Sequence, residues 1–265
     1  MSDTLTFVQE IARQAGALLR DGFGRVTHVE HKGATDLVTE FDRRSEELIL
    51  AALRARFPDH AVLAEESGAS GGDGKPGGYR WFVDPLDGTT NFAHGLPTFA
   101  VSIALALDNR PIVGVVFDPM RDELFAAEAC RGATLNGAPI RISAETRLQE
   151  ALLATGFTYD LKNARRNNFR EFEEIHFQVQ GIRRAGAAAL DGAWVGAGRL
   201  DAYWEFGMKP WDIAAGGLIV QEAGGRASTA DGNPDFVGSD SILVSNGHLH
   251  DALLAMLRQP SGELG

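Results

Sequence analysis

Residues 81–92 read W-F-V-D-P-L-D-G-T-T-N-F, and more can be inferred from this segment than from any other. The apolar run at 81–83 predicts a strand, and Asp84 and Asp87 follow it on either side of Pro85. Because the proline ring fixes one backbone angle, both carboxylates can be held on one side of a rigid turn. The segment therefore predicts a pair of acidic groups at the end of an apolar strand.

The residues after these aspartates are suited to binding an anion. Gly88, Thr89 and Thr90 lead into N-F-A-H, a predicted helix start whose free backbone amides can receive a phosphate. Metal ions beside such a turn would neutralise developing charge while the amides orient the group, as phosphoryl transfer requires. The alternative is an acidic turn with a threonine cap, and for an isolated D-P-x-D-G this alternative is the stronger one.

Acidic residues elsewhere in the chain decide between these two interpretations. Glu65 and Glu66 end a predicted strand at 61–64, where a carboxylate can enter a site. Asp212 stands at a helix start, and Asp42 lies in T-E-F-D, which resembles a capping box with aspartate in place of glutamate. Each has a structural explanation by itself, a solvated loop for the glutamates and a helix cap for the aspartates. Together they predict an oxygen-only site for a hard cation, Mg²⁺ first and Mn²⁺ as the alternative.

Hydrophobic periodicity and the positions of glycine and proline predict the remaining elements. We expect helices at about 5–22, 41–57, 163–179, 187–198 and 211–223, and a last one ending at Leu257. The expected strands are 61–64, 81–83, 101–107, 112–117, 123–127, 151–157, 201–206 and 241–245. A glycine-rich surface loop is expected at 67–78. Short connections favour antiparallel pairing of the strands between 101 and 127.

Composition places the chain among ordinary folded proteins. Its 265 residues are 44% hydrophobic and 23% charged, which allows a substantial core and is unlike disordered or coiled-coil chains. The net charge of −11 disfavours nucleic acid as the main ligand. Cys130 is the one cysteine, so we expect no intrachain disulfide and a reducing, cytoplasmic setting. No export signal and no membrane span are expected.

Other motif matches fail on their sequence context. G-A-S-G-G in the glycine-rich loop has the form of a serine hydrolase motif, but that motif needs a strand-to-helix turn at the serine. The glycines of A-W-V-G-A-G-R at 193–199 are expected to serve helix packing. His248 and His250 have no partner cluster and are expected at the surface rather than on zinc. Arg183 and Arg184 are expected to be solvated charges.

Several separated motifs together resemble the inositol monophosphatase family, particularly its bacterial members. They are D-L-V-T-E-F-D at 36–42, E-E-S-G at 65–68, V-F-D-P-M-R-D-E-L-F at 116–125, W-D-I-A-A-G-G-L-I-V-Q-E-A-G-G at 211–225 and the segment quoted first. The resemblance runs from the first helix to the last. It implies a layered αβαβα fold of the α/β class, with a largely antiparallel N-terminal sheet and a second mixed sheet. We expect two tightly packed halves, 1–143 with most metal ligands and 144–265 with Asp212 and the substrate contacts.

The resemblance also implies a metal site with two or three Mg²⁺ ions. Glu65, Asp84 and the Leu86 carbonyl would surround one ion, while Asp84, Asp87 and Asp212 would surround a second. Glu65 would also help to hold a third, weaker ion. A homodimer and sensitivity to lithium are implied in the same way.

Catalytic and substrate-binding roles follow from the same resemblance. Thr89 with Glu65 would position the attacking water, and Asp42 would orient the Thr89 hydroxyl. The implied substrate-binding residues are Asp87, Gly88, Thr89, Gly186, Ala187, Ala188, Glu205 and Asp212. Where many relatives have Gly followed by Ser or Thr, this chain has Gly186 and Ala187, which removes a hydroxyl near the expected substrate.

The leading hypothesis is direct attack of metal-activated water on a small polyol phosphate, inositol monophosphate first, with no phosphoenzyme. Histidinol phosphate, fructose 1,6-bisphosphate and 3′-phosphoadenosine 5′-phosphate are the alternative substrates. A hypothesis of another class is a protein that binds the transcription machinery. A pull-down in which the Asp84→Asn variant still bound polymerase would establish that activity, and no binding would count against it.

Overall fold

The structure is a computed structural model that describes residues 2–26, 28–31, 37–72, 77–158 and 166–258. Its helices are α1 (Asp3–Gly22), α2 (Glu40–Arg56), α3 (Thr89–Ala93), α4 (Phe169–His176), α5 (Ala188–Gly196), α6 (Pro210–Glu222) and α7 (His250–Leu257), with a 3₁₀ turn at Leu148–Glu150. Its strands are β1 (Val29–His31), β2 (Leu37–Thr39), β3 (Ala61–Ala64), β4 (Gly68–Ser70), β5 (Tyr79–Asp87), β6 (Ala100–Leu107), β7 (Arg110–Asp118), β8 (Glu123–Glu128), β9 (Ala133–Leu135), β10 (Ala138–Pro139), β11 (Leu152–Thr155), β12 (Gly181–Arg183), β13 (Ala202–Phe206), β14 (Arg226–Ser228) and β15 (Ser241–Ser245).

The first sheet is almost entirely antiparallel. Its strands lie in the order β10-β9-β8-β7-β6-β5-β3-β4, and β3 with β5 is its parallel pair. Nearly all of β6 is buried, because helices cover both faces of the sheet. The antiparallel pairing expected between 101 and 127 is confirmed.

The second sheet is mixed, as expected. Its order is β12-β11-β13-β15-β14. The strand β11 runs parallel to both of its neighbours, whereas β15 is antiparallel to β13 and β14. The sheets are formed from separate stretches of chain, 61–139 and 152–245. A division into halves at 143 and 144 stays a prediction.

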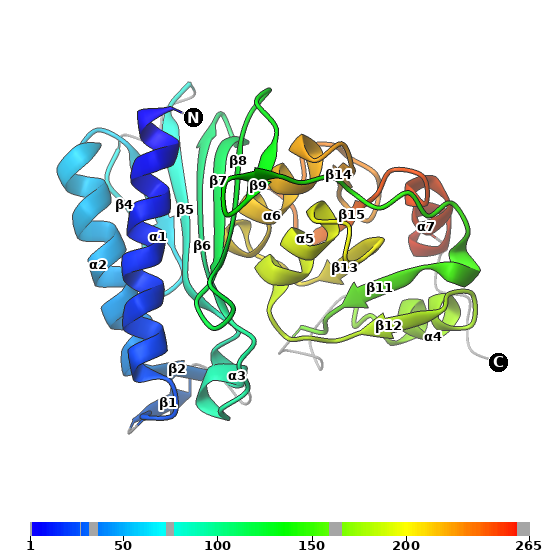
Figure 1. Ribbon diagram of the computed structural model, residues 1–265, viewed down its shortest axis with the longest axis horizontal. Helices are drawn as coiled ribbons and strands as arrows, with labels where there is room; N and C mark the ends of the chain where they lie inside the picture. The colour runs from blue at the N-terminus through cyan, green and yellow to red at the C-terminus, as the bar shows by residue number, and fades with distance from the viewer. Residues whose placement is uncertain (1, 27, 32–36, 73–76, 159–165, 259–265) are drawn as a thin grey trace.

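The elements stack in five layers (Figure 1). The pair α1 and α2 covers the outer face of the first sheet, and α5 and α6 fill the space between the two sheets. The outer face of the second sheet is covered by α4 and α7. This is the predicted αβαβα arrangement of an α/β fold.

Glycines allow the middle layer to pack closely. A Cβ on Gly114 of β7 would lie 3.1 Å from the backbone of Ala215 in α6. Likewise, a Cβ on Gly192 of α5 would lie 3.3 Å from Gly216. At Gly196 the added Cβ would meet the Ile219 side chain at 2.8 Å, so the packing role expected for the glycines at 193–199 is confirmed there.

The structure adds six short strands that were not expected, β1, β2, β9, β10, β12 and β14. It also differs from the expected elements at three further places. The expected loop at 67–78 contains β4, because the positive φ of Gly68 turns the chain back to pair with β3. The strand expected at 81–83 extends over Tyr79–Asp87. The helix expected at 163–179 is limited to Phe169–His176, and the residues before 166 lie outside the described residues.

The expectation that His250 lies at the surface is wrong. Its side chain is fully buried and lies 2.9 Å from Ser228 Oγ and 2.8 Å from Ser245 Oγ. Burial lowers the pKa of His250 to about 4. The residue therefore belongs to the packing of α7 on the second sheet.

Candidate active site

Asp84 and Asp87 lie at the end of β5, where the strand bulges. Between these two residues, β5 has one residue more than the paired stretch of β6. Pro85 lies in the bulge, a position that tolerates proline because the hydrogen-bond ladder is interrupted there. The Leu86 N–H donates to Asp84 Oδ1 at 3.0 Å. Both aspartates are buried, so the predicted acidic turn is a bulge inside the core.

Gly88 makes the turn from β5 into α3 possible. Its φ of 92° is left-handed, and a Cβ there would lie 3.0 Å from the Thr98 carbonyl oxygen. The same Cβ would lie 3.3 Å from Ala187 Cβ and from the Gly186 carbonyl oxygen. Only glycine fits this position without strain. The predicted anion-binding turn therefore lies directly against the predicted substrate segment.

Thr89 begins α3 and is tied to α2 through Asp42. Its Oγ1 lies 2.7 Å from Asp42 Oδ1 and 3.0 Å from the Leu86 carbonyl oxygen. Asp42 Oδ2 also accepts the Thr39 N–H at 2.8 Å, which completes the capping box of α2. The helix cap and the contact with Thr89 are both present.

Glu65 reaches the same region from β3. This strand runs parallel to β5, and Ala64 is paired with Val83. The residues that follow this pair, Glu65 and Asp84, therefore lie side by side. The Glu65 N–H donates to the Val83 carbonyl at 3.1 Å and keeps this alignment one residue beyond β3.

Asp212 comes from the middle layer, in the first turn of α6. Its Oδ2 accepts the Lys209 N–H at 2.7 Å, so Asp212 caps the helix as expected. Burial raises the pKa of Asp212 well above its usual range, and the charges of Glu65 and Asp87 raise it further. The cap residue therefore faces other carboxylates.

Glu65, Asp84, Asp87 and Asp212 form an acidic cluster. Burial raises the pKa of Asp84 well above its usual range, and the charges of Glu65, Asp87 and Asp212 add to that rise. Within the described ranges, no three acidic, histidine or cysteine side chains already lie in an arrangement that would hold a metal ion. Crowded anionic oxygens are nevertheless what a divalent cation stabilises. The donor set fits a hard cation, around which the carboxylates would have to close.

Asp87 also joins the first sheet to α5. Its Oδ1 accepts the Ala188 N–H at 3.0 Å and its Oδ2 accepts the Ala189 N–H at 2.9 Å. The N-cap residue of α5, Ala187, makes no side-chain hydrogen bond of its own. Burial raises the pKa of Asp87 to about 7, and the two backbone N–H groups oppose this rise. A carboxylate distant in sequence thus replaces the cap that Ala187 lacks.

Comparison with known proteins identifies the family of the chain. The model of the inositol monophosphatase family matches residues 1–262. The chain belongs to this family. It is therefore a phosphatase, a hydrolase of phosphoric monoesters.

Individual relatives of this phosphatase are similar over nearly the whole chain. An inositol-1-monophosphatase of Synechocystis sp. is 47% identical over 95% of this chain and 88% of its own length. The Nus factor SuhB of Pseudomonas aeruginosa is 46% identical over 97% of both chains. The crystal structure of the extragenic suppressor protein suhB from Bartonella henselae superposes with a TM-score of 0.91, at 39% identity, over 97% of this chain and 99% of that one.

A pocket of about 410 Å³ connects the acidic cluster of the phosphatase to the second sheet. The predicted site residues in its lining are Glu65, Asp87, Gly88, Gly186, Ala187, Ala188, Glu205 and Asp212. The other predicted site residues are joined to this lining by the hydrogen bonds and strand positions described above: Asp42, Asp84, Leu86 and Thr89. The structure therefore brings the predicted residues into one site.

Glu205, on β13, lines the same pocket. Burial raises the pKa of Glu205 to about 7. The Tyr203 hydroxyl donates to Glu205 Oε2 at 2.7 Å, and this bond opposes the rise. The carboxylate lies over Gly156, where an added Cβ would come within 2.0 Å of Oε2.

Sequence reasoning missed three further residues of this site. Arg184 and Asp191 both line the pocket, and Arg184 is exposed, as expected for a solvated charge. Asp191 is 2% exposed, and its buried Oδ1 has no hydrogen-bond partner within the described residues. Asn91 Nδ2 donates to the carbonyls of Thr98 at 2.7 Å and Ala185 at 2.8 Å, which ties α3 to the chain before α5. A lone acid in the apolar run A-A-A-L-D-G was the available signal for Asp191.

Proposed function

We propose that the chain is a Mg²⁺-dependent phosphatase of small polyol phosphates, with inositol monophosphate as the first candidate. The convergence of the acidic cluster on the Gly88–Thr89 turn carries this proposal. A phosphate bound at the turn would place its ester oxygen toward the pocket, whose lining includes Glu205. Acidic oxygens there can accept hydrogen bonds from alcohol hydroxyls.

The cluster supplies ligands for at least two ions. Glu65, Asp84 and the Leu86 carbonyl would hold one, and Asp84, Asp87 and Asp212 a second, with a third weaker ion at Glu65. Mg²⁺ bound there would supply charge neutralisation and a more acidic bound water, and Mn²⁺ is the alternative ion.

Thr89 and Asp42 would control the attacking water. Because the Thr89 hydroxyl donates its hydrogen to Asp42 Oδ1, the lone pairs of Thr89 Oγ1 are left to accept a hydrogen bond from water. Glu65 would accept the second hydrogen, and the Gly88 and Thr89 amides would bind the phosphate oxygens. Water would attack phosphorus directly, since the carboxylates are committed to cations. As the new P–O bond forms, the P–O bond to the alcohol would break, and the alcohol oxygen would leave and take a proton from solvent.

The activity is tested by phosphate release. We expect release from inositol monophosphate that requires Mg²⁺, stops with chelator and is lost in the Asp84→Asn variant. A kcat/KM comparison with histidinol phosphate, fructose 1,6-bisphosphate and 3′-phosphoadenosine 5′-phosphate ranks the substrates. Equal phosphate release with and without Mg²⁺ would refute the proposal.

Gly156→Ala tests the proposed contact of Glu205 with the alcohol. The added Cβ would overlap the Glu205 carboxylate, which is the flexible partner and must move. We expect KM for inositol monophosphate to rise about tenfold, the effect of weakening one hydrogen bond to a charged group. The kcat for p-nitrophenyl phosphate, which lacks polyol hydroxyls, should change less than about twofold.

Gly181→Ala is the matched control for this variant. Gly181 lies on β12, in the sheet that carries Glu205, and its added Cβ would meet only side-chain atoms, at 3.3 Å and beyond. An unchanged KM in Gly156→Ala, or an equal rise in Gly181→Ala, would remove Glu205 from the substrate contacts.

The substitution at Ala187 leaves the substrate order open to experiment. The missing hydroxyl is not needed to cap α5, because Asp87 does so. A Ser or Thr hydroxyl in relatives would therefore be available to a ligand. This difference is the reason for measuring the alternative substrates together.

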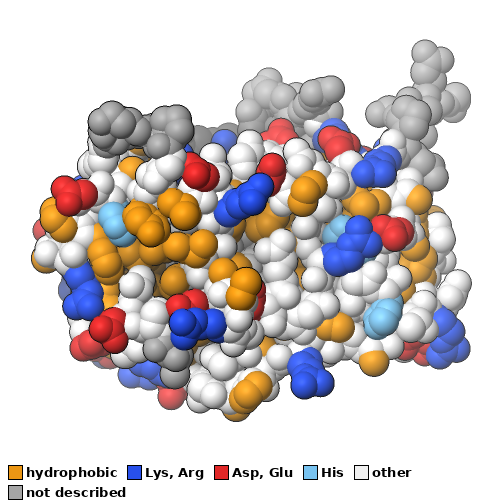
Figure 2. All heavy atoms as spheres, turned by 90° about the horizontal axis from the view of Figure 1, so that it is seen from above, with side chains coloured by type: hydrophobic (Ala, Val, Ile, Leu, Met, Phe, Trp, Pro, Cys, Tyr) orange, Lys and Arg blue, Asp and Glu red, His pale blue; other side chains and the backbone are white. Residues whose placement is uncertain are grey.

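Binding to the transcription machinery stays an alternative, because one relative carries the name Nus factor. Figure 2 shows Lys and Arg side chains scattered among acidic and hydrophobic ones on one face of the molecule, which gives little support to a nucleic-acid surface. The polymerase pull-down with Asp84→Asn tests this alternative.

Location and assembly are also predictions. Among the described residues, no helix has both the length and the apolar character needed to cross a membrane. A cytoplasmic, homodimeric enzyme inhibited by lithium is what we propose. Fractionation, light scattering and phosphate release in LiCl would test the three properties.

A further inference from the structure

One face of α2 contacts three segments of the active site. Asp42, Ser45 and Glu46 follow each other at helical spacing, so their side chains lie on the same side. Asp42 holds Thr89, as described above. The Ser45 hydroxyl donates to the Pro85 carbonyl at 2.8 Å, which fixes α2 to the bulge of β5.

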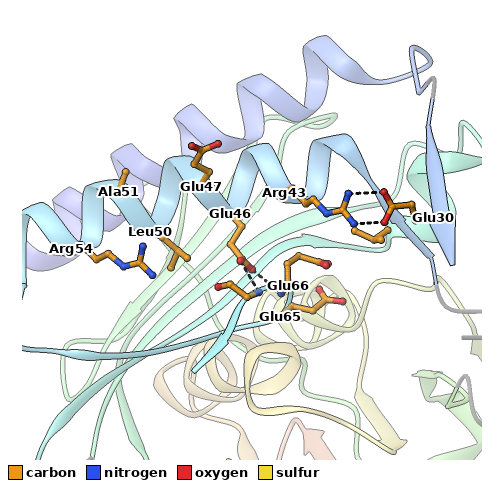
Figure 3. A pocket seen from close by; sticks show the side chains of 11 residues that line it. Glu30, Arg43, Glu46, Glu47, Leu50, Ala51, Arg54, Glu65 and Glu66 are labelled. Atoms are coloured by element: carbon orange, nitrogen blue, oxygen red, sulfur yellow. Dashed lines mark hydrogen bonds and ion pairs between the residues drawn. The ribbon is translucent and has the colours of Figure 1, made fainter. Parts of the chain in front are cut away.

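Glu46 contacts the third segment, the turn between β3 and β4. Its Oε2 accepts the Glu66 N–H at 2.8 Å, and its Oε1 accepts the Ser67 N–H at 2.9 Å. In Figure 3, Glu46 points from α2 toward the turn that begins with Glu65. Glu46 is 4% exposed, so the two accepting oxygens belong to a largely buried group, while the turn itself is partly exposed. Charge-assisted bonds of this kind are stronger than those between neutral groups.

These bonds restrict the backbone on the C-terminal side of Glu65. At Glu65 itself, the N–H is bonded to the Val83 carbonyl of β5. The next two N–H groups are bonded to Glu46. Because the backbone is held on both sides, the direction in which the Glu65 side chain leaves it is fixed as well.

A groove beside α2 is lined by Glu46 together with Arg43 and Arg54, and both arginines have other partners. Arg43 donates to Glu30, and Arg54 donates to Ser70 Oγ at 3.1 Å. Figure 3 shows the bidentate pair of Arg43 with Glu30 beside the bonds of Glu46. The bonds of Glu46 to the turn therefore do not depend on an ion pair with either arginine.

We propose that Glu46 is a positioning residue for the metal site. It acts through the Glu66 and Ser67 amides and holds Glu65 where Glu65 can bind a divalent cation. This inference rests on the proposed function, because it takes Glu65 as a metal ligand. Glu46 itself contacts neither the cation nor the substrate.

The test is direct Mg²⁺ binding to the folded protein, measured by calorimetry. In Glu46→Gln one oxygen is replaced by an NH₂ group that cannot accept an N–H. We expect the Kd for Mg²⁺ to rise about 10- to 100-fold, as for other residues that support a metal ligand. The kcat at saturating Mg²⁺ and the KM for substrate should change less than about threefold.

Glu47→Gln is the matched control. Glu47 is the next residue of α2, is exposed and lines the same groove, so the variant makes the same change in net charge. Its Kd for Mg²⁺ should equal that of the wild type. An equal rise in both variants would show a general charge effect and overturn the proposal.

The remaining outcomes separate the two hypotheses. If the wild type binds no Mg²⁺, the proposed function fails. If the wild type binds Mg²⁺ and Glu46→Gln binds it equally well, only the role of Glu46 fails.

Should Glu46→Gln not fold, Glu46→Asp keeps the charge but shortens the side chain. Wild-type Mg²⁺ affinity in Glu46→Asp would then overturn the proposal, and weakened affinity would support it.

Discussion

Asp87→Asn is expected to lower kcat/KM by more than about a hundredfold, because residues that merely support a metal ligand already cost 10- to 100-fold. Asp87 would bind a cation and also caps α5 with both of its oxygens. An asparagine keeps one oxygen that accepts a backbone N–H. Its NH₂ group faces the other backbone N–H and cannot accept a hydrogen bond from it. We also expect the rise in melting temperature caused by Mg²⁺ to shrink in this variant, since less binding energy is linked to folding.

Asp118→Asn is a control for the structural part of this effect. Asp118 is also fully buried and accepts the N–H groups of Met120 at 2.9 Å and Arg121 at 3.0 Å, but it does not line the pocket. This variant should lose stability and keep its response to Mg²⁺. Wild-type kcat/KM in Asp87→Asn would exclude Asp87 as a metal ligand.

The second large effect is the pH dependence of stability without metal. Burial raises the pKa of Asp87 and of Glu205 to about 7 and raises those of Asp84, Asp191 and Asp212 well above their usual range. The folded state then holds protons that the unfolded state has lost. Stability from these groups is full below their unfolded pKa values near 4 and is lost as pH rises through the folded values.

We expect the melting temperature of the chelated protein to fall by on the order of 10 °C between about pH 5 and pH 8, as a loss of several kcal/mol implies. His250, with its pKa lowered to about 4, and His60, whose pKa burial also lowers, act in the opposite direction. They are two groups against these five carboxyl groups and Asp42, whose pKa burial also raises. Saturating Mg²⁺ should flatten the profile, because the cation favours the ionised carboxylates. Calorimetry at several pH values with and without chelator measures both. If the melting temperature of the chelated protein rose with pH over this range, the expected repulsion between the buried carboxylates would be contradicted.

The sequence predicted most of the helices and strands because their signals are local, whereas the layered arrangement was implied by the family resemblance. Proline at 58, paired glycines at 224 and 225 and alternating apolar runs mark where helices and strands end. The capping roles of Asp42 and Asp212 were also readable, since each is determined within one helical turn. The strand β4 was missed because glycine and serine lack the apolar pattern of a strand, and its pairing depends on β3.

Asn91 and Glu46 were missed because each acts across a long sequence distance. Asn91 bonds a carbonyl at 185, and Glu46 bonds amides about twenty residues further on. Neither contact leaves a periodic or compositional mark in the sequence. The acids of the cluster were found because carboxylates at strand ends are unusual enough to be noticed one at a time, and the family resemblance then grouped them.

The lining of the pocket comes from different layers of the fold. The proposed phosphate site lies at the bulge of β5 and the turn at Gly88, whereas the proposed alcohol contacts lie on β13, at the start of α5 and after β11. In evolution, such a division would let the range of alcohols change by substitution near Gly156, Ala187 or Glu205 while the proposed hydrolytic site is inherited intact. A single ancestral catalyst could thus give rise to enzymes that differ in substrate and share one chemistry.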